Sequence, residues 1–266
     1  MQIEGAVTIV TGGANGIGAA MARRFAAAGA GGILVADLDE PAAALVAAEI
    51  VGLGVPAAAR RVDVTDRAQV EEMVLAAEER FGPVDLLCSN AGIGTGAGLD
   101  AGAEVWNRAW EVNVLAHVYA AQAVLPSMLE RGHGTLLNTC SAAGLLTMLG
   151  DAPYAVTKHA AVAFAEWLSI TYGTRGIQVA ALCPQGVETA LLREGAGSVA
   201  EQAVRLAGKV LAPEEVADVV VEGLTDGRFL ILPHPEVADH LRRKATDPDR
   251  WLTALQGIAA SMGATG

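Results

Sequence analysis

A phenol and an ammonium group, those of Tyr154 and Lys158, stand four residues apart in the stretch YAVTK, within a segment otherwise rich in Ala and Val. On an α-helix this spacing places both side chains on one face, close enough to interact. One interpretation is a solvated pair on the surface. The other is a device for proton transfer, and the rest of the chain has to decide between them.

The pair could act as a base if Lys158 lowers the pKa of the Tyr154 phenol. A free tyrosine has a pKa of about 10 and is a poor base at neutral pH. Lowering that pKa by about three units requires about 4 kcal/mol of preference for the phenolate, and one ammonium group at about 4 Å contributes on that order at an effective dielectric constant of about 20. We therefore expect Lys158 to supply the shift.

A glycine-rich turn, TGGANGIG, follows the apolar run at 7–11. Gly12, Gly16 and Gly18 stand where a strand would turn sharply into a helix, which leaves backbone amides and a helix N-terminus facing outward for a phosphate. The spacing is GxxxGxG rather than the GxGxxG of many dinucleotide-binding proteins. Taken alone, the turn is a weak signal for nucleotide binding, and a plain tight turn is the more common interpretation.

Asp37 ends the next apolar run, 19 residues after Gly18. A carboxylate at this place accepts hydrogen bonds from an adenosine ribose. Asp39 and Glu40 stand closer to Pro41, which is expected in the first turn of a helix, so Asp37 is not needed as a helix cap. A carboxylate here would repel a 2′-phosphate, and neither Asn15 nor Leu38 supplies a cation. The sequence therefore predicts NAD rather than NADP.

Short apolar runs alternate with longer stretches whose apolar residues recur every three or four positions, as at 19–30, 68–82 and 105–132. Strands are expected at 7–11, 33–36, 59–64, 84–88, 135–140, 177–183 and 228–232. This alternation predicts an α/β fold with a parallel sheet covered on both faces. One domain is expected over 1–235, followed by a helical tail, 236–266, that packs on the same domain or on an oligomer partner.

The net charge of −12 disfavours binding to nucleic acid or to an anionic membrane. The N-terminal stretch lacks the pattern of a secretory signal. Cys88, Cys140 and Cys183 have neither zinc-site spacing nor paired histidines, so no metal site and no disulfide framework is expected. We interpret them as small buried residues at strand ends, in a protein of the reduced cytoplasm.

Several motifs together resemble the short-chain dehydrogenase/reductase family over residues 1 to about 232. TGGANGIG resembles the family's TGxxxGIG turn, SNAG at 89–92 its NNAG segment, and CPQGVET at 183–189 its PGxVxT segment. Ser141 precedes Tyr154 by 13 residues, a distance similar to the family's spacing of serine and YxxxK. The resemblance implies a Rossmann-like, doubly wound fold, a nicotinamide cofactor and a catalytic tetrad of Asn113, Ser141, Tyr154 and Lys158.

The same resemblance implies which residues contact the cofactor. They are Gly12, Asn15, Gly16, Ile17, Gly18, Asp37, Asp63, Val64, Asn90, Ala91, Gly92, Tyr154, Lys158, Pro184, Val187 and Thr189. Two positions depart from the family pattern. Ser89 replaces the first asparagine of NNAG, which should change only a local hydrogen bond, and Gln185 replaces a glycine, which puts the neighbouring pocket wall in doubt.

The hypothesis for the reaction is that Tyr154 takes the hydroxyl proton of an alcohol while hydride leaves its carbon for the nicotinamide. Ser141 would hydrogen-bond the same oxygen. The resemblance implies that Asn113 positions a water that relays the proton from Lys158 toward solvent. For Asn113 an exposed polar position on a helix face is an equally open interpretation, and Ser141 alone could be a turn residue.

The substrate should lie between three segments: 92–98, 142–151 and a lid after Thr189. Arg193 is expected to be the one nearby cation. This largely apolar lining suits a hydrophobic secondary alcohol or ketone, although the same residues could simply be core. Glycines in REGAGS, 193–198, suggest that the lid is mobile. The proposed substrate contacts are Ile93, Ser141, Leu145, Met148, Tyr154 and Gln185, with Leu146, Leu149, Leu191 and Leu192 nearby.

The family is commonly oligomeric through the helices that would carry Asn113 and Tyr154, so a homodimer or homotetramer is expected. In the tail, Trp251 and Leu252 could seal a neighbour's pocket or an interface. Two other functions stay open: an NADPH-dependent ketoacyl or carbonyl reductase, and a non-enzymatic NAD-binding sensor. Asp37 and the acidic charge argue against the first, and the presence of Tyr154 and Lys158 against the second.

Overall fold

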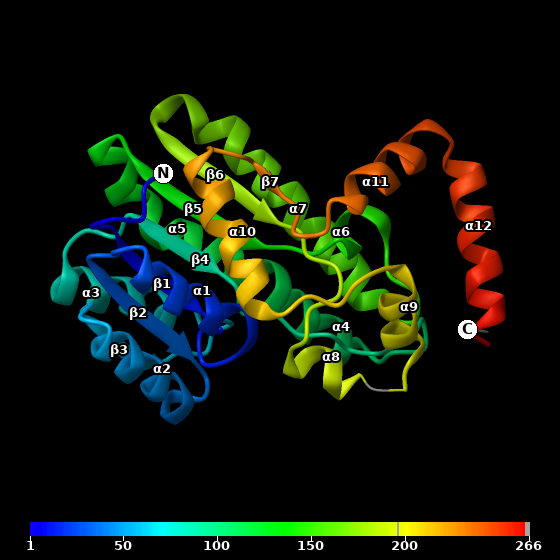
Figure 1. Cartoon of the computed structure of the whole chain (residues 1–266), viewed down its shortest axis with the longest axis horizontal. Helices are drawn as coiled ribbons and strands as arrows, with labels where there is room; N and C mark the ends of the chain where they lie inside the picture. Colours follow the sequence, from blue (N-terminus) through cyan, green and yellow to red (C-terminus); the bar gives the residue numbers. More distant parts are fainter. Residues whose placement is uncertain (196, 264–266) are drawn as a thin grey trace.

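A computed structural model describes residues 1–195 and 197–263. Its seven-stranded parallel sheet has the order β3-β2-β1-β4-β5-β6-β7 (Figure 1). The order reverses between β1 and β4, so the chain leaves these two neighbouring strands in opposite directions and opens a crevice at their carboxyl ends. This confirms the predicted doubly wound fold. The strands are β1 (Val7–Thr11), β2 (Gly32–Asp37), β3 (Ala57–Arg61), β4 (Leu86–Ser89), β5 (Gly134–Thr139), β6 (Ile177–Leu182) and β7 (Leu230–Ile231).

Most expected strands differ from the observed ones by one or two residues at an end, and one differs by more. The run at 59–64 was placed too late, because the ladder of β3 ends before Asp63, whose side chain accepts hydrogen bonds from the backbone and hydroxyl of Thr65 and turns the chain away. The run at 228–232 shortens to the two residues of β7, the edge strand that pairs with β6.

Helices cover both faces of the sheet, and each face has its own apolar core. Adjacent residues of β1 point to opposite faces: Val10 packs with α1, α2 and α10, whereas Ile9 packs with α3, α5 and α7. The helices are α1 (Gly16–Ala27), α2 (Glu40–Gly52), α3 (Arg67–Phe81), α4 (Ala103–Trp110), α5 (Ala116–Arg131), α6 (Ala143–Leu146), α7 (Ala152–Tyr172), α8 (Ala190–Glu194), α9 (Val199–Ala207), α10 (Pro213–Thr225), α11 (Glu236–Thr246) and α12 (Pro248–Ser261), with a 3₁₀ turn at Gly173–Arg175.

The helix expected at 105–132 runs over Ala103–Arg131 but changes form in the middle. A π-helical segment, Glu111–Leu115, joins α4 to α5 and carries Asn113. Such insertions are frequent at functional sites because they re-aim one side chain. By length and composition this helix could cross a membrane, yet 56% of its most apolar window is buried inside the fold, as in a core helix of a globular domain.

The tail forms α11 and α12, which lie at one end of the molecule beyond α6 and α9 (Figure 1). Val237 of α11 is completely buried and packs with Ala142 and Leu146. Trp251 of α12 packs against the same cluster, and the Lys244 ammonium donates to the Leu145 carbonyl at 2.6 Å. The tail therefore rests on the segment that follows Ser141.

Candidate active site

Helix α7 begins beside the cavity, and its first turns carry Tyr154 and Lys158. Asp151 caps the helix by accepting a hydrogen bond from the Tyr154 amide at 3.0 Å, and Pro153 stands in the first turn, where it leaves no helical hydrogen bond unmade. The Lys158 ammonium lies 5.6 Å from the centre of the Tyr154 ring. The spacing of YAVTK thus places both groups on one face, as the sequence predicted.

Lys158 is 3% exposed, and its ammonium donates to the Thr139 carbonyl at 2.9 Å. The solvated surface pair is therefore wrong for this residue. Burial lowers the pKa of the Lys158 ammonium, because the interior disfavours the charged form. A buried ammonium that is held by one carbonyl keeps two N–H donors for other partners.

The pKa of Tyr154 moves opposite to the expected direction. Burial raises it to about 12 and outweighs the hydrogen bond with the Ser141 hydroxyl, which lowers it, while the Asp151 carboxylate raises it further. Lys158 at 5.6 Å from the ring does not offset this. The expectation that Lys158 supplies the downward shift neglected the cost of burying the phenolate.

Ser141 and Asn113 flank this pair from two other elements. Ser141, buried after β5, accepts a hydrogen bond from the Ala143 amide at 3.0 Å, so its hydroxyl is held in a fixed place. Asn113 is completely buried, so its interpretation as a polar residue on an exposed helix face is wrong. Its amide donates to the Ile93 carbonyl at 2.9 Å and accepts from the Ile93 amide at 3.0 Å.

The glycine turn has the shape that a phosphate requires. Gly12 and Gly16 have φ of +61° and +54°, a region that suits glycine. A Cβ on Gly18 would lie 2.1 Å from the Gly12 carbonyl, so this position has no room for a side chain. Asn15 makes no side-chain cap at the start of α1, and the first amides of that helix remain available to an anion. The residues present therefore fit a dinucleotide phosphate.

Asp37 lies at the end of β2, against this turn. Its carboxylate accepts from the Ala14 amide at 2.9 Å and from the Asp39 amide at 3.1 Å, while Asp39 caps α2 as expected. As predicted, Asp39 and not Asp37 caps the helix, although Asp37 does hold two backbone amides. Each carboxylate oxygen accepts more than one hydrogen bond, so the two amides orient the group without using up its capacity for ribose hydroxyls.

Asn90 joins the carboxyl ends of three strands. Its side-chain amide donates to the Thr11 and Gly12 carbonyls at 3.0 and 3.2 Å and accepts from the Thr139 hydroxyl at 3.1 Å. Ser89, the departure from the family pattern, is buried at the end of β4 beside it. Asn90 therefore fixes the glycine turn relative to the segment of Ser141.

The segment 183–189 forms the wall of the active-site cavity opposite Tyr154. His234 contacts this wall at Gln185, the residue that departs from the family pattern. The His234 Nδ1 accepts from the Gln185 amide at 3.1 Å, so its Nε2 carries the proton and donates to the Lys209 carbonyl at 3.1 Å. The Pro184 carbonyl accepts from the Ala142 amide at 2.8 Å. The wall is thus tied to the segment of Ser141 and to the chain before α11.

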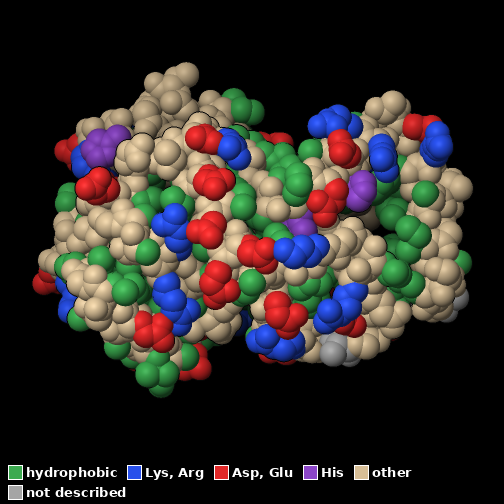
Figure 2. Space-filling view, in the orientation of Figure 1, with side chains coloured by type: hydrophobic (Ala, Val, Ile, Leu, Met, Phe, Trp, Pro, Cys, Tyr) green, Lys and Arg blue, Asp and Glu red, His purple; other side chains and the backbone are tan. Residues whose placement is uncertain are grey.

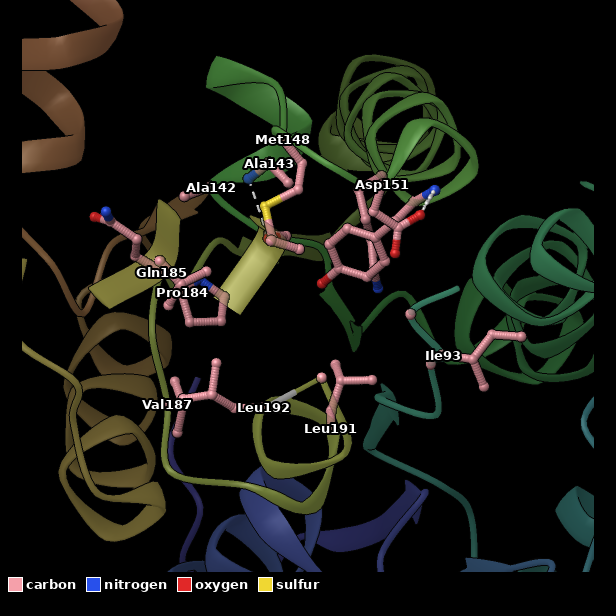
Figure 3. Close-up of a pocket in the computed structure, with 18 of the residues that line it drawn as sticks. Ile93, Ala142, Ala143, Met148, Asp151, Pro184, Gln185, Val187, Leu191 and Leu192 are labelled. Carbon is pink, nitrogen blue, oxygen red and sulfur yellow. Dashed lines mark hydrogen bonds between the residues drawn. The ribbon is translucent and has the colours of Figure 1, made fainter. Parts of the chain in front are cut away.

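One cavity of about 930 Å³ joins these parts (Figure 3). The predicted cofactor residues line it except Gly18, which packs against Gly12 instead. Two substrate predictions are wrong: Leu145 packs toward the tail, and Arg193 lies outside the lining and pairs with Glu188. Of the proposed lid, residue 196 lies outside the described residues. The predicted substrate residues that do line the cavity are Ile93, Ser141, Leu146, Met148, Leu149, Tyr154, Gln185, Leu191 and Leu192.

The sequence interpretation missed Asp151. This buried carboxylate accepts from the Thr95 amide at 2.7 Å, the Thr95 hydroxyl at 2.6 Å and the Gly96 amide at 2.8 Å, and so anchors the loop after β4 to the start of α7. An aspartate two residues before a proline is a helix-start signal that could have been used for the cap. Nothing local indicates the loop contacts, which span 56 and 55 positions.

A buried histidine was also missed. His117, one turn after Asn113, shares a 2.9 Å hydrogen bond with Asn138 of β5. Burial, together with the charge of Lys158, lowers the pKa of His117 to about 4. The imidazole is therefore neutral at physiological pH.

Tail residues line the far end of the same cavity, and the guanidinium group there is that of Arg243 rather than Arg193. The His240 ring also belongs to the lining, and Arg108 lies nearer the cofactor residues. Trp251 lines this chain's own cavity, and Leu252 is 51% exposed, so the expectation that they seal a neighbour's pocket or an interface stays a prediction.

Comparison with known proteins gives a consistent result. The family model "short chain dehydrogenase" matches residues 6–197. The chain is 35% identical to a 1-deoxy-11-beta-hydroxypentalenate dehydrogenase of Streptomyces exfoliatus over 93% of this chain and 90% of the relative. It is 36% identical to 2-(S)-hydroxypropyl-CoM dehydrogenase 3 of Xanthobacter autotrophicus over 85% and 91%. A crystal structure of a short-chain dehydrogenase/reductase from Burkholderia phymatum in complex with NAD superposes with a TM-score of 0.85 at 30% identity, covering 94% of this chain and 96% of that one.

Proposed function

The chain belongs to the short-chain dehydrogenase family and is an oxidoreductase of CH–OH groups; from this premise we propose that it uses NAD to interconvert a hydrophobic secondary alcohol and its ketone. The observation that carries the proposal is the single cavity in which Tyr154 and Ser141 face the glycine turn and Asp37. The bound nicotinamide would supply the hydride acceptor or donor. The names of the two relatives, a hydroxypentalenate and a hydroxypropyl dehydrogenase, support an alcohol substrate.

Tyr154 is the proposed general acid and base. Because its pKa is about 12, the phenol is protonated at neutral pH and ready to donate to a ketone oxygen. For oxidation of an alcohol the phenolate must be favoured, and Lys158 contributes to this together with the positive charge of an oxidised nicotinamide. Ser141 would hydrogen-bond the same substrate oxygen and fix its distance from Tyr154.

Lys158 and Asn113 have supporting roles in this proposal. Among the described residues, the Lys158 ammonium donates one hydrogen bond, to the Thr139 carbonyl. Its other two N–H groups are therefore left for the cofactor ribose and for a water. A Cβ on Gly92 would lie 3.3 Å from both the Lys158 Nζ and the Asn113 Oδ1, so the two groups lie beside the same glycine. This supports Asn113 as the residue that positions a relay water beside Lys158.

Asp37 is the proposed determinant of the cofactor. A 2′-phosphate would meet this carboxylate, which two backbone amides hold in place, and the repulsion favours NAD. The high pKa of Tyr154 favours the reductive direction, so an NADPH-dependent carbonyl reductase is the second candidate, and the cofactor preference separates the two. A sensor without catalysis would have no use for a fixed Ser141 and Tyr154.

We also propose a homo-oligomer in the cytoplasm. Val156, Trp167 and Ile170 form an exposed apolar stripe along α7, with 49%, 53% and 82% exposure. Such a stripe suits a second copy of the chain. The three buried, free cysteines are compatible with a reducing compartment.

The experiment that tests the proposal replaces Tyr154 by phenylalanine. Tyr154→Phe should fold and bind NADH, but kcat/KM for a secondary alcohol should fall by about two to four decades, since the variant lacks the transferable proton. Tyr172→Phe, which changes a tyrosine at the far end of α7, is the matched control and should leave kcat/KM unchanged. Equal activity of Tyr154→Phe and the wild type would refute the assignment.

A further inference from the structure

The cavity extends well past the place where the reacting carbon would lie. Its cofactor end is lined by the glycine turn and Asp37, and its far end by residues of α9 and α12. The space left beyond Ser141 is therefore closed by elements that follow residue 197, where the match to the family model ends. This end of the cavity is a feature of the chain's own carboxyl-terminal segment.

The walls of this far end are apolar on three sides. Met148 and Leu149 follow α6, Val204 and Leu206 belong to α9, and α12 contributes an inner face of apolar residues. The members of that inner face are Trp251, Ala254, Leu255 and Ile258, at the i, i+3, i+4, i+7 spacing of one helix face.

Some of these side chains remain exposed although they line a hollow. Leu206 is 73% exposed and Ile258 is 42% exposed. Figure 2 shows this part of the surface as a recess between the body of the molecule and α12. Apolar side chains gathered around a recess that continues into a catalytic cavity are typical of a binding site for an apolar group.

The wall is held in place by the tail's own anchors. Val237 is completely buried against Leu146, and Asp247 caps α12 by accepting from the Arg250 amide at 3.0 Å. Trp251 lies 5.9 Å, between ring centres, from His240 of α11. Through Trp251, which packs against the cluster of Ala142, Leu146 and Val237, α12 contacts the segment that follows Ser141.

We propose that α12 is the specificity wall of the enzyme, and that the substrate is a secondary alcohol with a long or bulky hydrocarbon skeleton whose distal part lies between α12 and α9. The proposal rests on the proposed function, because the reacting carbon must lie at Tyr154. A small alcohol would leave this end of the cavity unfilled, whereas each further carbon would cover exposed apolar surface.

The test is a series of 2-alkanols, from 2-butanol to 2-decanol, with NAD⁺. In the wild type, kcat/KM should rise by up to about fourfold per added methylene, the limit set by transfer of one CH₂ out of water. Ala254→Trp, which fills the recess from α12, should abolish the gain of 2-decanol over 2-butanol, by about tenfold or more. Ala260→Trp, on the same helix but outside the cavity lining, is the matched control and should behave as the wild type.

The outcomes separate this inference from the proposed function. No turnover of any alcohol would overturn the function, whereas turnover of 2-butanol with no gain along the series, or a gain that survives Ala254→Trp, would overturn the specificity wall. Calorimetric binding of 2-decanone and 2-butanone to the NADH complex gives a second measurement that needs no turnover. Tighter binding of 2-decanone in the wild type and in Ala260→Trp, but not in Ala254→Trp, is expected; equal binding of the two ketones by the wild type would contradict the inference.

Discussion

Two lysines make the same kind of contact in two regions of the molecule, one at the catalytic cavity and one where the tail meets α6. Lys158 donates to the Thr139 carbonyl inside the sheet region, and Lys244 donates to the Leu145 carbonyl where the tail meets α6. The first is 3% exposed, whereas the second is only half-buried. The sheet region fixes the reacting groups by burial and by hydrogen bonds between strands, while the tail region lies on it through a small cluster. We infer that chemistry depends on the first region and substrate choice on the second.

The distinction between the two regions is tested most directly by removing the ammonium group of Lys158 and that of Lys244 in two separate variants. Lys158→Met should lower kcat/KM by about two to four decades, because the proposed proton transfer through Tyr154 loses its positive neighbour. Lys244→Met should leave kcat for a small alcohol within about twofold, since its loss costs only about one hydrogen bond of roughly 0.5–1.5 kcal/mol. Steady-state kinetics of both variants measure this. Similar losses would show that the tail takes part in the chemistry.

A second prediction concerns the cofactor within the sheet region. Asp37→Ala should weaken NAD binding about 10- to 100-fold, the cost of a charge-assisted hydrogen bond, and should relax the discrimination against NADP. Asp39→Ala is the matched control: it removes the cap of α2 and should lower stability by about 1 kcal/mol without changing the NAD-to-NADP ratio. A wild type that already prefers NADP would contradict the proposed role of Asp37.

The buried side chain of His117 should make the stability of the sheet region depend on pH. Burial lowers the pKa of His117 to about 4, below its value in an unfolded chain of about 6.5. The neutral group therefore stabilises the fold above pH 6.5, and this contribution is lost as the pH falls through about 4. It amounts to at most about 3 kcal/mol.

Urea unfolding between pH 7 and pH 4 measures this contribution. In His117→Gln the free energy of unfolding should fall less steeply with acid than in the wild type. His133→Gln, which changes an exposed histidine with a side chain 62% accessible, should keep the wild-type slope. Identical slopes for all three proteins would show that His117 is not the titrating group.

The two regions also differ in how much of them the sequence predicted. The glycine turn and the Tyr154–Lys158 pair have spacings within one turn or one helix, so local pattern was enough to place them. The sequence could not place the contacts of Asp151, whose partners lie more than 50 residues away, nor the pairing of His117 with Asn138 across two elements. It also assigned Leu145 to the pocket, because a helix of four residues gives no periodicity from which to read its buried face.

The role of the tail was harder still to predict from the sequence, because it depends on which surface the tail packs against. Trp251 was expected to cover a neighbour's pocket or an interface, and only the fold of the chain before α11 turns it toward its own cavity. The prediction that the pKa of Tyr154 is lowered was wrong for a related reason. The cost of burying a phenolate depends on its surroundings, and the spacing of residues in the sequence does not reveal them.

The smallest expected effect concerns the stability that α12 contributes. None of its residues is buried, although Trp251 packs against the cluster of Val237. Ending the chain after Thr246 should therefore lower the free energy of unfolding by only about 1 kcal/mol, or Tm by about 2–4 °C. Val237→Ala, one small truncation at a completely buried site in α11, should cost more, about 2 kcal/mol, because it leaves a cavity. Thermal unfolding compares the two variants, and a larger loss for the shortened chain would place α12 within the core that supports Ser141 and end the distinction between the two regions.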